Sequence, residues 1–349
     1  MKEIGFVGGY WSTNIGNSFF NIGAQYVLQK IFPLDRVRMI SDQPGYWTFW
    51  DKKKGNPRNA LDLIGSYSLD YLVLLGPCLT ETFGALWEKS LEKLFSRGTK
   101  LIILSAGQMK YTEQETESAR KVLQKYKPYI LSSRDRETYE NFHDCAEHSY
   151  DGIDLACFVS DIYRPNKLDL GKYITLNLDK LPEPDFTESN SMDDAQITIE
   201  GKNYILNFPK LRNSLCEKSD VFRYIDSFFP FRKNIDHIED HKIIRIINRF
   251  NPMITKRVYQ EKNSFVSDIP YSYLDLFANS EVTITDRVHS CVASLVYGKS
   301  AILCKKTGRS KLLDRIGAQK IQEKTTMINQ EFLQKEKLSL LSTLGNWLS

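Results

Sequence analysis

Short apolar runs alternate with longer stretches of mixed apolar and charged residues throughout the first half of the chain. The apolar runs have the length of β-strands, and the mixed stretches repeat their apolar residues at the spacing of an amphipathic helix. This alternation predicts an α/β fold with a parallel sheet. The expected strands cover residues 3–11, 37–41, 71–77, 100–108 and 129–135, and the expected helices cover residues 17–32, 82–98, 112–126 and 136–143.

The second half has a different pattern. Residues 172–208 hold an expected strand, an acidic loop and an expected hairpin around residues 201–202. The acidic loop is more typical of a surface insertion than of a lid over a site. A long helix is expected at about 236–250, and a helix, strand, helix and strand follow within 273–306. A last helix is expected at 330–348.

The length of the chain favours two domains. A chain of 349 residues is long for one hydrophobic core. The change of pattern places the expected boundary between residues 164 and 170, and we take residues 1–165 and 166–349 as the two domains, with the last helix in the second.

Composition excludes several classes of protein. Hydrophobic residues make up 42% of the chain and charged residues 26%, which is ordinary for a globular protein. The 47 basic and 43 acidic residues are interleaved and give a formal charge of +4, too even a balance for a dedicated nucleic-acid-binding protein. The N-terminus lacks the apolar core of a signal peptide, and no apolar run approaches the ~20 residues of a membrane span. The sequence indicates a cytoplasmic protein without a nucleic-acid partner.

Neither a metal nor a cofactor is expected. The six cysteines are scattered without a C-x-x-C pair and indicate reduced core residues. His143, Cys145 and His148 lie close together, but no second pair of ligands follows, so an exposed loop is favoured over a closed metal site. The glycines after the first strand do not follow the spacing G-x-G-x-x-G, and no G-K-[S/T] occurs, which argues against binding of NAD or ATP.

The stretch ITDRVHS, residues 284–290, carries the strongest chemical signal. It lies where a β-branched strand ends and a helix begins, which is where open α/β sheets bind ligands. A helix N-terminus attracts anions, and Arg287 adds a permanently charged planar fork. His289 can donate a proton near neutral pH, and a neighbouring anion would keep it protonated. The stretch predicts a site for a small, doubly anionic molecule; the structural alternative is that Arg287 and His289 pair with Asp286 or cap a neighbouring helix.

This stretch also resembles a known family. Residues 280–303, SEVTITDRVHSCVASLVYGKSAIL, resemble the C-terminal signature of the polysaccharide pyruvyl transferases, in which a strand leads to D-R-x-H, a small-residue helix and another strand. The resemblance covers about residues 4–320. Other segments that resemble the family in the same order are GGYWSTNIGNSFFNIGA (8–24), YLVLLGP (71–77), LIILSAG (101–107), ILSSRDRETYENF (130–142) and DGIDLACF (151–158).

The resemblance implies two Rossmann-like domains that face each other across a cleft, as in the glycosyltransferase B architecture, with the acceptor side in residues 1–165 and the donor side in residues 166–349. It implies phosphoenolpyruvate as the donor and a sugar of a cell-surface or exported polysaccharide, which can be lipid-linked, as the acceptor. By motif position, Arg287 and His289 carry over as catalytic residues. The residues carried over as donor-binding are Arg134, Arg287, His289 and Ser290, and those carried over to the acceptor side are Asn14, Asn17, Gly76 and Gly107.

Asn17 departs from the family pattern, whose N-x-G-D turn has an aspartate at this position. An asparagine cannot replace an aspartate that acts as a base, but it can replace one that caps a helix. We favour the capping role, because asparagine and aspartate cap helices about equally well. The departure therefore concerns the acceptor chemistry rather than donor binding.

The implied reaction gives each charged residue a role. Protonation of the methylene carbon of phosphoenolpyruvate makes the adjacent carbon electrophilic, so that two sugar hydroxyls can add and phosphate can leave. We expect His289 to be that acid or the proton donor on the phosphate side, and Arg287 and Arg134 to clamp the phosphate and the carboxylate. Two other functions stay open on the same scaffold: a sugar-nucleotide-dependent glycosyltransferase and a non-catalytic glycan-assembly protein.

A basic segment raises the question of membrane contact. The expected helix at 236–250 would place Lys242, Arg245 and Arg249 on one face. A solvated face is the default interpretation of such a pattern. The alternative is peripheral contact of residues 228–257 with anionic lipid at the inner face of the membrane.

Overall fold

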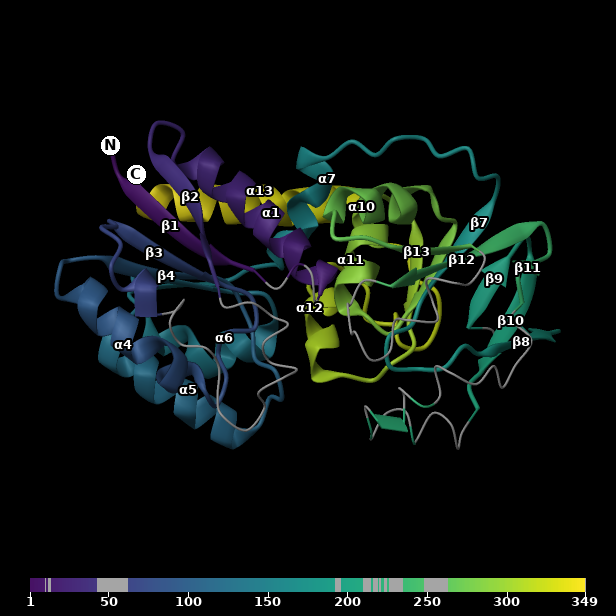
Figure 1. The fold of residues 1–349 in the computed structure, drawn as a ribbon, viewed down its shortest axis with the longest axis horizontal. Coiled ribbons are helices and arrows are strands. Elements are labelled where there is room, and N and C mark those ends of the chain that lie inside the picture. Colours follow the sequence, from purple (N-terminus) through teal and green to yellow (C-terminus); the bar gives the residue numbers. More distant parts are fainter. Residues whose placement is uncertain are drawn as a thin grey trace.

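The computed structural model describes residues 1–9, 11, 14–42, 62–191, 196–209, 215, 219, 221–222, 225, 235–247 and 263–348. Figure 1 shows two α/β halves side by side, each built around its own sheet, with the chain passing from one to the other after α7 (Val159–Ile162). The alternation of strands and helices expected from the sequence is confirmed in both halves.

The N-terminal sheet is entirely parallel. Its strands follow the spatial order β2-β1-β3-β4-β5-β6. The central strands are apolar on both faces because helices cover both faces, as parallel sheets require. The bounds are Glu3–Gly8 for β1, Arg36–Ser41 for β2, Tyr71–Leu75 for β3, Lys100–Ala106 for β4, Ile130–Ser133 for β5 and His148–Asp151 for β6.

Two separate sets of helices cover the two faces of this sheet. Alternate residues of β3 point to opposite sides: Val73 joins the core beneath α1, and Leu74 joins the core beneath α4 and α5. Figure 1 shows α4 and α5 together on one side of the sheet and α1 on the other. The bounds are Ile15–Ile31 for α1, Phe83–Phe95 for α4, Glu113–Tyr126 for α5 and Arg136–Phe142 for α6.

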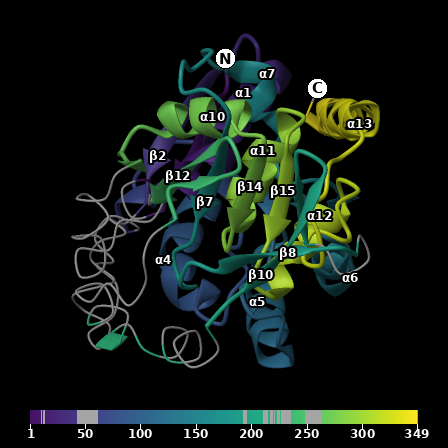
Figure 2. The same cartoon turned by 90° about the vertical axis from the view of Figure 1, so that its right-hand side faces the viewer.

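The C-terminal sheet is parallel except at one edge. Its strands follow the order β11-β12-β7-β14-β15, β13 pairs with β12, and among these described strands the antiparallel pair is β11–β12. Figure 2 shows β7, β14 and β15 side by side, with α10 and α11 close to them. The bounds are Tyr173–Asn177 for β7, His237–Ile238 for β11, His241–Ile247 for β12, Ser264–Val266 for β13, Val282–Thr285 for β14, Ser300–Leu303 for β15, Pro270–Asn279 for α10 and Val288–Val296 for α11.

A small antiparallel sheet contains the expected hairpin. Its order is β8-β10-β9, with Asp185–Ser189 as β8, Ile197–Ile199 as β9 and Lys202–Asn207 as β10. Gly201 lies in the β9–β10 turn with a φ of 78°, a conformation that favours glycine. Within the expected acidic loop, residues 182–194, the stretch Asp185–Ser189 is a paired strand, and residues 192–194 lie outside the described residues.

The last helix, α13 (Gln330–Leu348), lies against the N-terminal half. The Tyr129 hydroxyl donates to the Trp347 carbonyl at 2.7 Å, and the buried Lys337 ammonium reaches Ser160 at 3.0 Å. Figure 1 shows α13 beside α1 and β1. We propose a domain boundary at residue 165, with α13 packed back onto the N-terminal domain.

The helix expected at 236–250 is wrong. The structure has a two-residue strand β11, a turn, and the strand β12 over His241–Ile247. The isoleucines that fit a helical spacing, such as Ile243 and Ile247, also fit a parallel strand, and the neighbouring Ile244 and Ile246 are buried as well. A β-branched run that is apolar on both faces is typical of a strand between two others.

The shared basic face expected for Lys242, Arg245 and Arg249, by default solvated, is also wrong in the described residues. Arg245 is only 4% exposed and forms an ion pair with Glu183 at 2.6 Å, whereas Lys242 is exposed on the same strand. Arg249 and most of residues 228–257 lie outside the described residues. Among the helices that the structure describes, none has the length and apolarity to cross a membrane.

One hydrophobic core connects the two halves. It contains Phe6 of the first sheet, Phe19 of α1, and Phe277 and Leu295 of the second half. Phe19 and Phe277 meet edge to face with ring centroids 6.4 Å apart. This shared core holds the two sheets in one arrangement, so residues after the strands of one sheet meet residues after the strands of the other.

Candidate active site

The candidate site is formed by segments that follow the carboxyl ends of parallel strands from both halves. The N-terminal half contributes Asn14 after β1, Arg134 after β5 and Asp154 after β6, and the C-terminal half contributes Arg287 and His289 after β14. Ligands bind at this edge of open α/β sheets because the loops and helix N-termini gather there. The site is therefore completed only where the two halves meet.

Arg287 spans the boundary between the halves. Its Nη2 donates to Asn14 Oδ1 at 3.2 Å, and its Nη1 lies 3.4 Å from Asp179 Oδ2. The side chain is about one-tenth exposed. Arg287 is also the residue before α11, and its backbone N–H donates to Thr285 Oγ1 at 2.9 Å. The guanidinium is thus anchored at the helix N-terminus, where its charge adds to that of the helix dipole.

Asp286 does not pair with Arg287 as the structural alternative supposed. Its carboxylate accepts hydrogen bonds from the backbone N–H groups of residues 179–181, at 2.5–3.1 Å. Burial and the neighbouring Asp179 raise the pKa of Asp286. Asp286 therefore fixes the loop after β7, and the Arg287 guanidinium contacts Asn14 and Asp179 instead.

Asn17 has a different bond from the helix cap that we expected. Its Oδ1 accepts a hydrogen bond from Asn14 Nδ2 at 2.9 Å, and Asn14 itself makes no side-chain cap to α1. This bond turns Asn14 so that its Oδ1 faces Arg287. Asn17 therefore orients Arg287 through Asn14, which an asparagine can do as well as an aspartate because only an acceptor oxygen is needed.

Arg134 is the most deeply buried cation of the site. It is 1% exposed, and its Nη1 donates to Asp154 Oδ2 at 3.1 Å. Its Nε and Nη2 are buried without a hydrogen-bond partner. Burial alone would lower the pKa of Arg134, but the negative charges of Asp154 and Asp135 help to raise it, so the guanidinium stays charged. Two unpartnered donors on a buried cation suit an anion with several acceptor oxygens.

His289 lies against both halves. Its Nε2 is 3.6 Å from Asp154 Oδ2, its ring centroid is 5.3 Å from that of Phe20, and its side chain is 13% exposed. A Cβ on Gly16 would lie 3.1 Å from the His289 Cβ and 3.2 Å from Nδ1, so the close approach of α1 to the imidazole depends on a glycine there. The His289 Nε2 is buried without a hydrogen-bond partner.

Burial and charge determine the protonation of this pair. Burial would raise the pKa of Asp154, but interaction with His289 and the charge of Arg134 outweigh it and hold this pKa well below its usual range. Burial also lowers the pKa of His289, and the positive charges of Arg134 and Arg309 add to this effect against the carboxylate of Asp154. With only the protein's own charges around it, His289 is neutral at neutral pH beside an ionised Asp154.

Ser290 and Gly76, like Gly107, are expected site residues that do not line the pocket. Ser290 is fully buried, and its hydroxyl donates to Asn177 Oδ1 at 2.6 Å, which holds the first turn of α11 against the end of β7. Gly76 has a φ of 69°, and a Cβ there would meet the Phe20 ring at 3.1 Å. Both positions therefore support the walls of the site.

Two neighbouring cavities occupy the site. We call the first the arginine pocket; it has a volume of about 20 Å³, roughly the room of one water molecule, so a larger anion requires side chains to move apart. We call the second the N-terminal pocket; it has a volume of about 350 Å³. Asn14, Asn17, Pro77 and Arg309 line both. The other residues of the arginine pocket are Gly16, Arg134, Arg287, Val288, His289 and Leu312.

Arg309 and Asp154 are site residues that the sequence did not reveal. Arg309 lies in a short 3-10 turn, Gly308–Ser310, after β15 and contributes a third arginine to the arginine pocket. The basic run KKTGRSK that follows the expected strand was the available signal. Asp154 lies within the segment that resembles the family, but no charge partner was evident until the fold brought it to Arg134.

Gly107 offers a test of the packing around Arg134. A Cβ at this position would lie 2.5 Å from Arg134 Nε, and the buried guanidinium has little room to yield. Gly107→Ala is expected to destabilise the protein by about 1–3 kcal/mol, as overpacking does, and to weaken anion binding at Arg134. Gly345→Ala is the control, because a Cβ there meets nothing within 4 Å and α13 gains helix propensity. Thermal unfolding of both variants measures the loss of stability. Equal Tm values for Gly107→Ala and Gly345→Ala would contradict the tight packing of Arg134 against Gly107.

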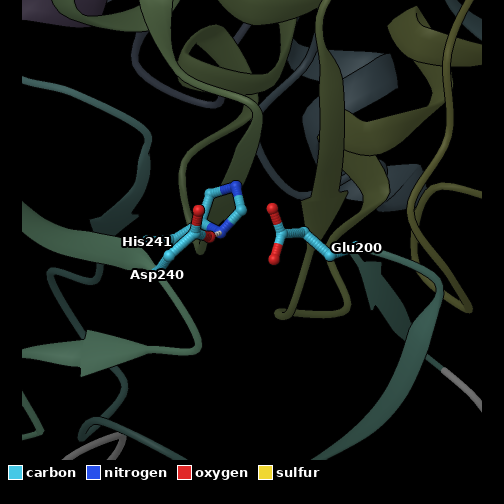
Figure 3. A group of neighbouring side chains, drawn as sticks. All are labelled: Glu200, Asp240 and His241. Atoms are coloured by element: carbon cyan, nitrogen blue, oxygen red, sulfur yellow. Dashed lines mark ion pairs between the residues drawn. The ribbon is translucent and has the colours of Figure 1, made fainter.

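A cluster of side chains outside the site has the geometry of a metal site. Figure 3 shows Glu200, Asp240 and His241 converging from the β9–β10 and β11–β12 turns, with one ligand atom of each within 4.8 Å of the others. The Lys172 ammonium already forms ion pairs with Glu200 and, at 3.0 Å, with Asp240. His241 lies 3.0 Å from Glu281. We therefore assign the cluster as an ion-pair network that ties the small sheet to the larger one.

The structural comparisons define the class of fold. The S. aureus MnaA-UDP co-structure is 10% identical with a TM-score of 0.54, and the match covers 100% of this chain and 90% of that chain. A UDP-N-acetylglucosamine 2-epimerase from Rickettsia bellii is 10% identical with a TM-score of 0.51, and the match covers 99% and 97% of the two chains. Two facing α/β halves with the site between them are thus a glycosyltransferase B-like fold. At this identity the likeness concerns the fold alone.

The family comparison is more specific. The model of the family described as polysaccharide pyruvyl transferase matches residues 14–305, which include Arg134, Arg287 and His289. The chain therefore belongs to the polysaccharide pyruvyl transferase family. No curated protein matches the chain.

Proposed function

We propose that the protein transfers the pyruvyl group of phosphoenolpyruvate to a sugar of a cell-surface or exported polysaccharide, forming a cyclic ketal and releasing phosphate. The observation that carries the proposal is the convergence of three arginines and a histidine in one pocket. Two buried guanidinium nitrogens of Arg134 have no hydrogen-bond partner in the protein. The membership of the family supports a transferase that acts on a polysaccharide.

The donor's charges match those of the arginine pocket. Phosphoenolpyruvate carries a phosphate and a carboxylate on one carbon, so it needs two sets of donors a short distance apart. In this proposal Arg134 and Arg287 bind these two groups as planar forks, and Ser290 acts by holding α11 in place rather than by contact with the donor. Arg309 supplies the third positive charge from the C-terminal half.

His289 is the proposed acid. A doubly negative donor next to the imidazole raises its pKa, which burial and Arg134 otherwise lower. The imidazolium then protonates the methylene carbon or the departing phosphate. The atoms balance without a further reactant: of the two acceptor hydroxyl protons, one ends in the new methyl group and the other leaves with phosphate. Asp154 keeps the imidazole in position and stabilises its positive charge.

This linkage predicts proton uptake when a dianion binds. Sulfate stays doubly negative around neutral pH, so any proton taken up on its binding comes to the protein. We expect calorimetry in two buffers of different ionisation enthalpy to show uptake, and sulfate affinity to rise as the pH falls toward the anion-raised pKa of His289, because protonation and anion binding favour each other. His289→Gln should abolish the uptake. Equal uptake in that variant would show that another group is protonated.

Phosphate release tests the proposed function. The purified protein is incubated with phosphoenolpyruvate and a panel of saccharide acceptors, and free phosphate and the mass of the saccharide are followed. We expect phosphate and pyruvylated saccharide to appear in equal amounts. A second arm replaces phosphoenolpyruvate by UDP-N-acetylglucosamine, because both structural neighbours carry UDP or a UDP-sugar in their names. Nucleotide release with no phosphate release from phosphoenolpyruvate would overturn the proposal in favour of a sugar-nucleotide enzyme.

A further inference from the structure

Tyr111 lies where the two halves meet, beside the turn that carries Arg309. It follows β4, in the loop before α5 of the N-terminal half. Its ring packs against Gly308 of the other half: a Cβ on that glycine would lie 2.9 Å from Tyr111 Cδ2 and 3.5 Å from Cε2. The Lys311 ammonium lies 5.0 Å from the centroid of the same ring, within the range of a cation–π contact. The ring thus contacts residues on both sides of Arg309 in the sequence.

The N-terminal half fixes both the backbone and the side chain of Tyr111. The buried Glu115 carboxylate accepts hydrogen bonds from the backbone N–H groups of residues 109–111 at 2.8–3.2 Å. These bonds hold Tyr111 at a φ of 57°, in the left-handed region that residues other than glycine rarely adopt. Its hydroxyl donates to Asp135 Oδ2 at 2.9 Å. Burial raises the pKa of Tyr111, so the hydroxyl keeps the proton that it donates.

Asp135 links Tyr111 to Arg134. It is fully buried, and as the N-cap of α6 it accepts hydrogen bonds from the backbone N–H of Thr138 at 2.8 Å and from its hydroxyl at 2.9 Å. The residue before Asp135 is Arg134, so one short segment after β5 positions both the buried guanidinium and the acceptor of the Tyr111 hydroxyl. A continuous set of contacts therefore runs from Arg134 to the turn that carries Arg309.

The turn that carries Arg309 depends on what packs against it. A 3-10 turn of three residues, Gly308–Ser310, that begins with glycine constrains its own backbone weakly. Besides burial, the charge of Arg309 lowers the pKa of His289, so Arg309 lies near the imidazole. Lys311 also forms an ion pair with Glu137 of α6, but both side chains are well exposed, and such pairs contribute little. The Tyr111 ring is therefore the contact that fixes the turn.

We propose that Tyr111 is a positioning residue, whose ring holds the turn Gly308–Ser310 so that Arg309 lines the arginine pocket together with Arg134. The identity of the bound anion rests on the proposed function, whereas the positioning role rests on the packing of the ring. Tyr111 is not among the described residues that line either pocket, so it acts through Arg309 rather than by contact with the anion. The position of a charge in one half is thus set by a side chain of the other half.

Calorimetric titration of the full chain with sulfate tests this role without donor chemistry. Tyr111→Ala and Arg309→Ala are each expected to weaken sulfate binding about fivefold, because a positive charge leaves the pocket. The double variant should bind no more weakly than Arg309→Ala alone, since Tyr111 acts through Arg309. Tyr111→Phe keeps the ring and should stay within about twofold of the wild type. The control Tyr67→Ala changes an exposed tyrosine at the opposite edge of the sheet, before β3, and should change nothing.

Three outcomes of these titrations would overturn the proposal. They are wild-type affinity in Tyr111→Ala, an additive loss in the double variant, and a loss in Tyr111→Phe as large as that in Tyr111→Ala. The first would separate the ring from the pocket, the second would separate Tyr111 from Arg309, and the third would assign the effect to the hydroxyl.

Gly308→Ala tests the same contact from the C-terminal half and needs no change at Tyr111. The added methyl group would meet the ring at 2.9 Å, so the turn must shift, and sulfate affinity is expected to fall severalfold. In the Tyr111→Ala background the ring is gone, so Gly308→Ala should add no further loss. Gly345→Ala is the matched control, because a Cβ there meets nothing within 4 Å. Unchanged sulfate affinity in Gly308→Ala, or an equal loss in both backgrounds, would overturn the proposal.

Steady-state rates with phosphoenolpyruvate and a productive saccharide separate this role from the proposed function. Tyr111→Ala is expected to raise the KM for phosphoenolpyruvate about as much as it weakens sulfate binding, with a smaller change in kcat. Sulfate binding that depends on Tyr111, together with no turnover of phosphoenolpyruvate, would leave the positioning role standing and overturn the pyruvyl transfer. Turnover of phosphoenolpyruvate with a wild-type KM in Tyr111→Ala would overturn the positioning role and leave the proposed function standing.

Discussion

Replacing Arg287 by alanine is expected to weaken the binding of phosphoenolpyruvate by about 100-fold or more. The guanidinium lies at the boundary of the two halves, bonded to Asn14 and close to Asp179, and it is the fork nearest to the N-terminus of α11. Loss of two charge-assisted hydrogen bonds, at about 1.5–3 kcal/mol each, accounts for a change of this size. Calorimetric titration of the variant with phosphoenolpyruvate measures the effect.

Two further variants make the Arg287 result specific. Arg287→Lys keeps the charge but loses the planar fork, so its affinity should fall between those of the wild type and Arg287→Ala. Arg136→Ala removes an exposed guanidinium that pairs with Glu140 and Asp151, and it should bind phosphoenolpyruvate as the wild type does. Circular dichroism and Tm confirm that each variant is folded. Unchanged affinity in folded Arg287→Ala would remove this residue from the donor site.

Replacing His289 by glutamine is expected to lower kcat by about 10²–10⁴-fold, the usual contribution of a positioned acid. Glutamine keeps a hydrogen-bonding side chain beside Asp154, so the affinity for phosphoenolpyruvate should fall far less than kcat. A large fall in kcat with a small change in the affinity for phosphoenolpyruvate distinguishes an acid from a residue that only contributes positive charge. Steady-state rates with a productive saccharide, together with donor titrations, measure both quantities.

The control for His289 is His143→Gln, which changes an exposed imidazole at the end of α6 that lies 3.3 Å from the Glu140 carbonyl. Its kcat should equal that of the wild type. Should His289→Gln keep a kcat within a factor of a few of the wild type, proton transfer would have to come from another group or from water, and the mechanism would need a different acid.

The sequence predicted most of the strands and helices because the apolar residues of most segments repeat at the spacing of either a strand or a helix. One exception is β12, where Ile243 and Ile247 satisfy a helical spacing and a strand equally well, so that only the neighbouring strands decide. The pattern of apolar residues also did not predict where α13 packs. An amphipathic helix shows that one face is buried, but the partners Tyr129 and Ser160 belong to distant parts of the chain.

The candidate site was predictable where it follows strand ends. Arg287 and His289 were expected from the rule for the carboxyl edge of a sheet and from the family motif, and Arg134 was expected from the family motif alone; the structure brings all three to one pocket. Arg309 and Asp154 were missed because the basic run around Arg309 and the family-like segment around Asp154 do not show which cavity each residue lies near. The rotation of α11, which turns Ser290 toward Asn177, depends on packing that a motif does not specify.

The most direct test of the central claim is a crystal structure of the protein with phosphoenolpyruvate bound. We expect the donor to lie between the two halves, with its phosphate and carboxylate bound to the guanidinium groups of Arg134 and Arg287. The imidazole of His289 should lie within hydrogen-bond distance of the donor. Phosphoenolpyruvate bound at any other place on the molecule, with these three side chains left as they are now, would contradict it.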